Sequence, residues 1–300
     1  MATFTKSVQQ FPLLFGASGV GEHVEMKHIS EVKRGKACGC RCPVCGATLI
    51  AHKGKRRMHH FTHFFVSECK GSAETALHLY AKQLIAKQKK VRLPTVQAFK
   101  HANPLTASKL YQAQKSILEQ SVGKHVVDVL LQQENHSLAV ELKVSHAVDP
   151  YKERSFIRSG QEAIEIDVSA IYQDLYERYQ CVPTLEQLSS AILYSKKHRR
   201  WLFNRHQHNF EYKQRHSATP RKIKSVQRPD YHHHWVRNCP DPERRRIKRM
   251  DNYRLAYARL HQDCGRCPHC FEVEYQYEWV GYQRVPVQPA CVLCTYPLRA

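Results

Sequence analysis

Alternating apolar and polar positions between Val126 and Val144 predict two strands joined by a tight turn at residues 134–137. The first strand is apolar except for Asp128. In the second, side chains alternate between two faces, so Glu141 and Lys143 lie side by side on one face. If the strands pair antiparallel around the turn, Asp128 comes alongside Glu141 and Lys143.

This arrangement puts two carboxylates and an ammonium in apolar surroundings. Burying such groups costs several kcal/mol per ion unless they are paired or bind a metal. Mg²⁺ takes one or two protein carboxylates and completes its shell with water and phosphate oxygens. Asp128 and Glu141 could hold the ion, and Lys143 could orient a water or neutralise charge on a phosphate. The pattern favours phosphodiester hydrolysis; the alternative is an exposed hairpin with a Glu/Lys surface pair.

The flanking pattern predicts helices and a further strand around this hairpin. Periodic apolar positions predict a helix from Ser72, a plausible cap, to about Lys89. A strand is expected over 91–99, a helix from Asp149-Pro150 to about Gly160, and a buried strand over 163–168. Strand, hairpin, helix and strand together indicate an α/β fold, a mixed sheet with helices against it.

The predicted helix from Ser72 also carries a polar stripe. Glu74, His78 and Lys82 recur four residues apart and therefore share one face. Such a row is commonly a solvated face. Next to the hairpin it would instead present Glu74 as a third carboxylate and His78 as a proton shuttle.

Cysteines and histidines near the N-terminus indicate a zinc site. The knuckle Cys42-Pro-Val-Cys45-Gly turns two thiolates toward one ion. His60 and His63 fit best as the remaining ligands of a Cys2His2 site. The alternatives that the sequence leaves open are Cys38, Cys40, His52, His59 and Cys69.

A second cysteine pattern closes the chain. Cys267-Pro-His-Cys270 and Cys291-Val-Leu-Cys294 flank a stretch that alternates like a strand, which is the spacing of a zinc ribbon. Cys264 is a spare neighbour. With all four positions filled by protein, this second Zn²⁺ would be structural, as would the first.

The composition of the chain predicts the kind of molecule it binds and the cellular compartment it occupies. The 300 residues carry a formal net charge of +21, which favours a polyanionic partner, above all nucleic acid. No long apolar run indicates a membrane partner, and the first residues show no signal-peptide pattern. Seven of the 12 cysteines stand in C-x2-C spacing, which favours zinc in a reducing compartment and therefore a cytoplasmic location.

The excess charge is concentrated in the C-terminal half. Residues 196–259 hold 19 Lys or Arg against 5 Asp or Glu, interleaved with aromatic residues that could stack on bases. The alternative is an ordinary basic surface whose rings are core. Thr184 starts a helix, residues 217–230 read as a loop or linker, and 183–260 as a whole is expected to be a basic helical region. His232-His-His234 could bind a metal with Cys239.

Several of these motifs, in this order, resemble the competence protein CoiA-like family. The match covers roughly residues 30–170, with Val-Val-Asp in place of the family's Pro-Asp and Thr62 in place of an alanine, and nothing is recognised beyond about residue 185. The residues that carry it are Cys42-Pro-Val-Cys45-Gly, His60-Phe-Thr-His63, Glu74-Thr-Ala-Leu-His78 with Lys82, Asp128, Glu141-Leu-Lys143 and Glu165-Ile-Asp167.

The resemblance implies a restriction-endonuclease-like PD-(D/E)xK core and a divalent-metal nuclease that acts on DNA. Asp128 and Glu141 would bind Mg²⁺ or Mn²⁺, Lys143 would be the catalytic lysine, and Glu74 an added carboxylate of the first helix. The expected role is DNA uptake and processing or antiviral defence.

The segments expected are 1–70 (N-terminal strands and zinc motif), 71–182 (nuclease-like core), 183–260 (basic helical region) and 261–300 (zinc ribbon). The alternative function is a non-catalytic, zinc-dependent nucleic-acid-binding protein. A further one is an adaptor that recruits a protein partner such as an ATPase or recombinase.

Overall fold

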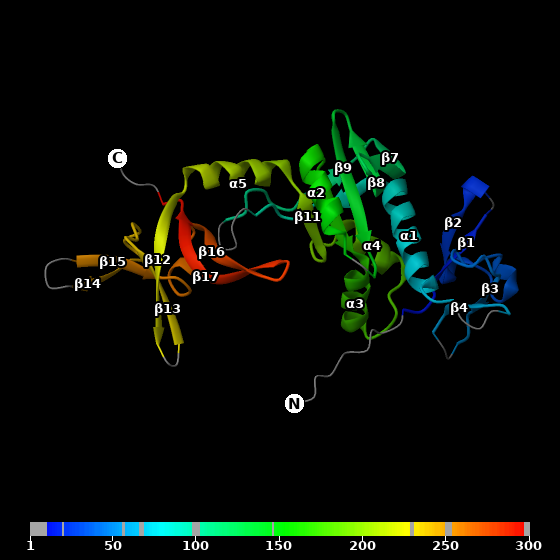
Figure 1. Ribbon diagram of the computed structural model, residues 1–300. Helices are drawn as coiled ribbons and strands as arrows, with labels where there is room; N and C mark the ends of the chain where they lie inside the picture. The colour runs from blue at the N-terminus through cyan, green and yellow to red at the C-terminus, as the bar shows by residue number, and fades with distance from the viewer. Residues whose placement is uncertain are drawn as a thin grey trace. The chain divides into compact units, whose positions relative to one another are not determined.

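The computed structural model describes residues 11–296 except 20, 56–57, 66–68, 98–102, 146, 229–230 and 250–253. The chain forms two compact units (Figure 1). Unit 1 comprises Met1–Thr95 and Ala107–Asn204, and unit 2 comprises Val96–Thr106 and Arg205–Ala300. Each unit is built around its own large sheet.

The core of unit 1 is a mixed five-stranded sheet with strand order β11-β10-β9-β8-β7. β9 and β10 are parallel, and the other neighbours are antiparallel. The strands are β7 (Lys115–Val122), β8 (His125–Gln133), β9 (His136–Lys143), β10 (Ala163–Asp167) and β11 (Arg199–Phe203).

The hairpin predicted from the alternating pattern is β8–β9. Its turn is shorter than expected, because Gln133 already pairs with His136 and only Glu134 and Asn135 lie between them. Glu134 adopts a left-handed φ of 48°, which a two-residue hairpin turn requires. The pairing runs back to Val129 and Val140, so Asp128 and Glu141 stand next to the point where the described ladder ends.

Helices cover both faces of this sheet. α1 (Ser72–Gln88), α3 (Val168–Tyr179) and α4 (Leu185–Tyr194) share one apolar core with alternate residues of β8–β10, including Val140 and Ile164. α2 (Pro150–Ser159) inserts the buried Phe156 into a smaller core on the other side. Two-sided coverage explains why β9 and β10 are buried along nearly their whole length.

Helix ends follow the capping chemistry of the sequence, with one difference. Thr184 and Gln187 form the predicted capping box at the start of α4, and Asp149 caps α2. Ser72, expected as a cap, is instead the first residue of α1, and Gly71 with φ 74° precedes it. A glycine accepts this left-handed turn without steric penalty, so the chain can bend sharply into the helix.

Small paired strands complete unit 1. Phe15 stacks on Tyr80 of α1 at a centroid distance of 4.1 Å, which packs the N-terminal part against that helix. The pairs are β1 (Phe15–Ser18) with β2 (Glu25–His28), β3 (Leu49–His52) with β4 (His60–His63), and β5 (Lys90–Arg92) with β6 (Leu110–Gln112). β5 is shorter than the strand predicted over 91–99, whose last two residues lie outside the described residues.

Unit 2 is built on a six-stranded antiparallel sheet with strand order β14-β15-β13-β12-β17-β16. Its elements are α5 (Arg205–Ser217), β12 (Thr219–Arg228), β13 (Tyr231–Arg237), β14 (Arg246–Arg249), β15 (Arg254–Arg259), β16 (Cys270–Val280) and β17 (Gln283–Cys294). A small core around Val236, Ala258 and Val292 holds the strands together.

The basic helical region expected over 183–260 is therefore largely β-structure. Among the described residues of this range only α4 and α5 are α-helical, and β12 (Thr219–Arg228) takes up most of the segment 217–230 that was expected to be a loop. The β-branched residues Thr219, Ile223 and Val226 favour a strand here, but the density of Lys and Arg hides this signal. Pro220 is compatible with pairing: β12 pairs with β17 through Pro220 and Leu293.

At the level of class, the expected α/β fold is confirmed, with five α-helices and several sheets in the described part of the chain. Among the described residues, no helix has the length and apolar character that a membrane crossing requires.

Candidate active site and metal centre

Asp128 lies where β8 and β9 separate, and its side chain continues the hydrogen bonding of the strands. Its Oδ2 accepts a hydrogen bond from the backbone N–H of Leu142 at 2.9 Å. Two side chains of α1 also reach it: His78 Nε2 lies 3.2 Å from Oδ2, and Lys82 Nζ lies 3.4 Å from Oδ1. Burial alone would raise the pKa of Asp128, but His78, Leu142 and Lys82 together hold it below its usual value. Asp128 is therefore ionised at neutral pH.

Glu141 is the most deeply buried acid of the group, with a side chain 5% exposed. Its Oε2 accepts a hydrogen bond from Lys152 Nζ on α2 at 2.7 Å, and the same ammonium binds the carbonyl oxygen of Val126. Its Oε1 is buried without a hydrogen-bond partner among the described residues. Burial raises the pKa of Glu141 to about 7 against the pull of Lys152, and the charge of Asp128 adds to the rise. Glu141 thus titrates near neutral pH.

Lys143 projects from the same strand and is paired with an acid of the next one. Its Nζ lies 2.6 Å from Oδ2 of Asp167, which is its register partner on β10. Asp167 also caps α3 through Oδ1, which accepts from the backbone N–H of Ala170. Burial would raise the pKa of Asp167, but Lys143, Ser169 and Ala170 hold it low. The lysine is therefore fixed by an ionised carboxylate at a helix start.

Glu165 extends the row of acids. It is the register partner of Glu141 on β10 and is likewise buried. Its Oε2 accepts from the backbone N–H of Val148, and its Oε1 accepts from Arg200 Nε at 2.9 Å. Parallel pairing with matched register puts Glu141 and Glu165 side by side. Two cations, Lys152 and Arg200, neutralise these neighbouring carboxylates.

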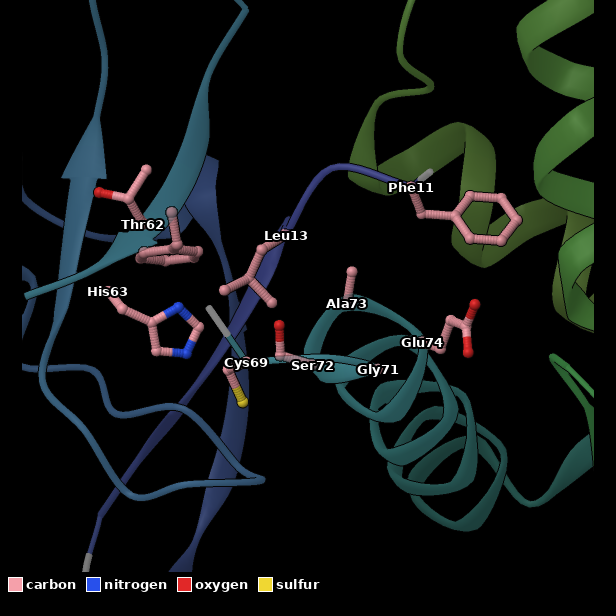
Figure 2. A pocket seen from close by; sticks show the side chains of 10 residues that line it. Phe11, Leu13, Thr62, His63, Cys69, Gly71, Ser72, Ala73 and Glu74 are labelled. Carbon is pink, nitrogen blue, oxygen red and sulfur yellow. The ribbon is translucent and has the colours of Figure 1, made fainter. Parts of the chain in front are cut away.

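Of the predicted catalytic residues, the structure links His78 directly to Asp128 and places Glu141 near both, while Lys143 lies further along β9. Glu74 is one helical turn before His78 and lines a pocket of about 420 Å³ (Figure 2). Figure 2 shows its carboxylate pointing away from His63 and Cys69. In the described part of the chain, no three carboxylate or imidazole ligand atoms of this site lie within 4.8 Å of one another.

Sequence reasoning assigned no role to Lys152 or Arg200, although both make direct ion pairs here. They come from α2 and β11, and no motif spacing connects them to the hairpin. Glu165 and Asp167 did carry a signal, because their alternation in β10 repeats that of Glu141 and Lys143 in β9. Matching the two strands in register would have located the extra acids.

The N-terminal cysteines form a candidate metal centre. Ligand atoms of Cys42, Cys45, His63 and Cys69 all lie within 4.8 Å of one another. The knuckle between the first two is closed by the N–H of Gly46, which donates to the carbonyl oxygen of Cys42 at 2.9 Å. His63 Nε2 is buried without a hydrogen-bond partner in the described region, as expected of a nitrogen reserved for a metal. This Cys3His cluster could bind zinc.

The fourth ligand position differs from the predicted set: Cys69 occupies it in place of His60. His60 and His63 are three residues apart on β4, and side chains of a strand alternate, so the two rings face opposite ways. His60 stacks on His52 at 5.1 Å on the outer face, while His63 shares the inner side with buried Phe61. Cys69 precedes α1 and was among the alternatives that the sequence left open.

The C-terminal cysteines also group differently from the predicted ribbon. Cys267, Cys270 and Cys294 line one small cavity in unit 2, together with Cys239 and Cys264. Cys291, the fourth predicted ligand, does not line it, and its Sγ donates to Glu274 Oε2 at 3.1 Å. The alternation of β17 again explains this, because positions 291 and 294 lie on opposite faces.

Comparisons with known proteins add no identity: no family model, curated protein or solved structure matches this chain.

Proposed function

We propose that the charged cluster of β8, β9 and α1 is the active site of a divalent-metal-dependent nuclease that hydrolyses DNA phosphodiester bonds. The observation that carries this proposal is the buried Oε1 of Glu141, which has no hydrogen-bond partner among the described residues and lies beside the ionised Asp128. A buried oxygen without a partner costs about 1–3 kcal/mol, and a bound cation removes that cost. Lys143 follows two residues later on the same strand, on the same face as Glu141.

The donor set fits Mg²⁺ or Mn²⁺. Two carboxylates from adjacent strands are the hard ligands that such ions take, and water and phosphate oxygens complete the shell. When bound, the ion would polarise a phosphoryl oxygen and acidify a water.

Each residue of the charged cluster has a role in this mechanism. Asp128 and Glu141 would hold the ion, and the hydrogen bonds from His78 and Leu142 fix the orientation of the Asp128 carboxylate. Lys143 neutralises charge that builds up on the phosphate, and Asp167 positions its ammonium. Lys152 balances Glu141 while no divalent cation is present.

The fold and the charge support the same class of substrate. A mixed sheet between helices agrees with the restriction-endonuclease-like core that the family resemblance implies. The net charge of +21 suits a nucleic-acid partner, and a role in DNA uptake or in defence against foreign DNA follows from the resemblance. A protein partner such as an ATPase or recombinase belongs to the same proposal.

One observation favours the rival function, a nucleic-acid-binding protein without turnover. Glu141, Glu165 and Asp167 are each already paired with a cation of the protein: Lys152, Arg200 and Lys143. Such pairs can serve to hold strands and helices together and nothing more.

A cleavage assay separates the two functions. Single- and double-stranded DNA are incubated with the full chain and Mg²⁺ or Mn²⁺, beside Asp128→Asn, Glu141→Gln and Lys143→Met. These variants keep side-chain size, so we expect a loss of cleavage of about 10³-fold or more with DNA affinity retained.

Glu134→Gln is the matched control, because its side chain is exposed at the turn of the same hairpin, and it should cleave as the wild type does. Cleavage that persists in Glu141→Gln refutes the site assignment. No cleavage by the wild-type chain with either metal, combined with tight DNA binding, supports the non-catalytic function.

A further inference from the structure

Five cysteines of unit 2 surround one small cavity. Its volume is about 20 Å³, and its lining includes Cys239, Cys264, Cys267, Cys270 and Cys294. All five are free thiols, and none is paired in a disulfide. Thiols concentrated around a space of this size are the typical setting of a metal ion bound by sulfur.

Three local structures bring the sulfurs together. Two consecutive turns space Cys264, Cys267 and Cys270: the N–H of Cys267 donates to Cys264 O, and that of Cys270 to Cys267 O, each at 3.1 Å. The β16–β17 pairing sets Cys294 opposite Cys270. Cys239 follows the end of β13 and packs against the same core. The five thiols therefore come from three separate segments joined by one sheet.

We propose that unit 2 binds one zinc ion in this cavity through Cys239, Cys294 and two thiolates of the run Cys264–Cys270. Cys291 stays outside the site, since it lies on the other face of β17 and donates to Glu274. Four thiolates around zinc leave no open position, so the ion has a structural role. This proposal is independent of the nuclease function, because no residue of the cavity belongs to unit 1.

Binding requires the sulfurs to draw closer. Among the described residues, only the N-terminal cluster brings three or more candidate ligand atoms within 4.8 Å of one another. Zinc–sulfur bonds of about 2.3 Å would pull Cys239 toward the β16–β17 pair. The free energy of binding would then stabilise the sheet of unit 2, whose apolar core is small.

Alkylation of the wild-type chain tests the ligand set without any substitution. The zinc-loaded full chain is treated with iodoacetamide, and each cysteine is quantified by peptide mass spectrometry before and after a zinc chelator. We expect Cys291 to react in the absence of chelator, as the exposed Cys181 does. Cys239, Cys267, Cys270 and Cys294 should react only after zinc is removed.

Zinc stoichiometry by native mass spectrometry gives a second readout. The wild-type chain should hold two zinc ions, Cys239→Ser one, and the matched control Cys291→Ser two. Cys69→Ser should also hold one, because it removes a ligand of the other centre. Equal zinc content in the wild type and Cys239→Ser, protection of Cys291, or alkylation of Cys239 while zinc remains bound in unit 2 would each overturn the proposal.

Discussion

The central sheet of unit 1 and the six-stranded sheet of unit 2 both carry many charged side chains, but they place them differently. Glu141 on β9 and Glu165 on β10 are buried, and each is paired with an opposite charge. All four residues of β14 in unit 2 are exposed. Buried charges are tied to one geometry, whereas exposed charges create a field that attracts any polyanion. This contrast supports the proposed division of tasks, with catalysis in unit 1 and contact with a polyanion in unit 2.

The first prediction concerns pH and has the largest expected effect. The pKa of Glu141 is about 7 in the folded chain against an ordinary value of 4.5. The folded chain thus binds this proton more strongly, so the contribution to stability is complete below pH 4.5 and is lost as the pH rises through 7. The loss corresponds to about 3 kcal/mol.

This loss is measured as the difference in unfolding free energy between the wild type and Glu141→Gln, from urea titrations at pH 4.5 to 8 without added Mg²⁺. Asp128, His78 and Lys152 face Glu141 and are present in both proteins. Glu278→Gln on β16 is an exposed control that should follow the wild-type curve. A flat difference between the wild type and Glu141→Gln would mean that the carboxyl group is not buried as described.

The second prediction compares a buried with an exposed lysine. Lys152→Met leaves Glu141 without its ammonium and should lower the unfolding free energy at pH 8 by about 2 kcal/mol. Lys224→Met on β12 removes an exposed cation and should change it by less than about 0.5 kcal/mol. If both variants lowered the unfolding free energy equally in urea titrations, the buried and exposed lysines would not differ in their contribution to stability. The double variant Lys152→Met, Glu141→Leu should recover most of the loss, because neither charge then remains unpaired.

The third prediction concerns the field of unit 2 and has the smallest effect. Lys248→Ala with Arg249→Ala should reduce the slope of log affinity against log salt by about 2 in DNA-binding titrations. The matched control is Arg178→Ala on α3, an exposed arginine already paired with Asp174. An unchanged slope in the β14 variant, or an equal reduction in Arg178→Ala, would remove β14 from the DNA-binding surface.

Local pattern predicted the hairpin and the caps of α2 and α4, because strand alternation and capping are set by a few neighbouring residues. The partners Lys152 and Arg200 could not be predicted, since tertiary packing alone brings α2 to Glu141 on β9 and β11 to Glu165 on β10. The sequence indicates Cys239 only as a possible metal ligand together with the histidines of β13. Its proximity to Cys267 depends on the order of strands in unit 2, which local sequence does not reveal.

The alternation of side chains along a strand, which predicted the hairpin, also explains why two predicted metal ligands, His60 and Cys291, lie outside their clusters. His60 and His63, like Cys291 and Cys294, are spaced by three residues, which suits a turn or helix but divides them between the faces of a strand. The strands of unit 2 were hidden for another reason. Repeated Lys and Arg suggested a basic helical surface, although β-branched and aromatic residues, which favour strands, occur among them in β12 and β13.

The short connection between Cys69 and α1 links the N-terminal metal centre to the charged cluster. Only Lys70 and the left-handed Gly71 separate that ligand from the first helical residue, and α1 then carries His78 and Lys82 to Asp128. An ion that anchors Cys69 also anchors the first turn of the helix. Chelation would loosen the helix that orients Asp128 while leaving every residue of the cluster intact, so inactivation by a chelator need not report the removal of a catalytic ion.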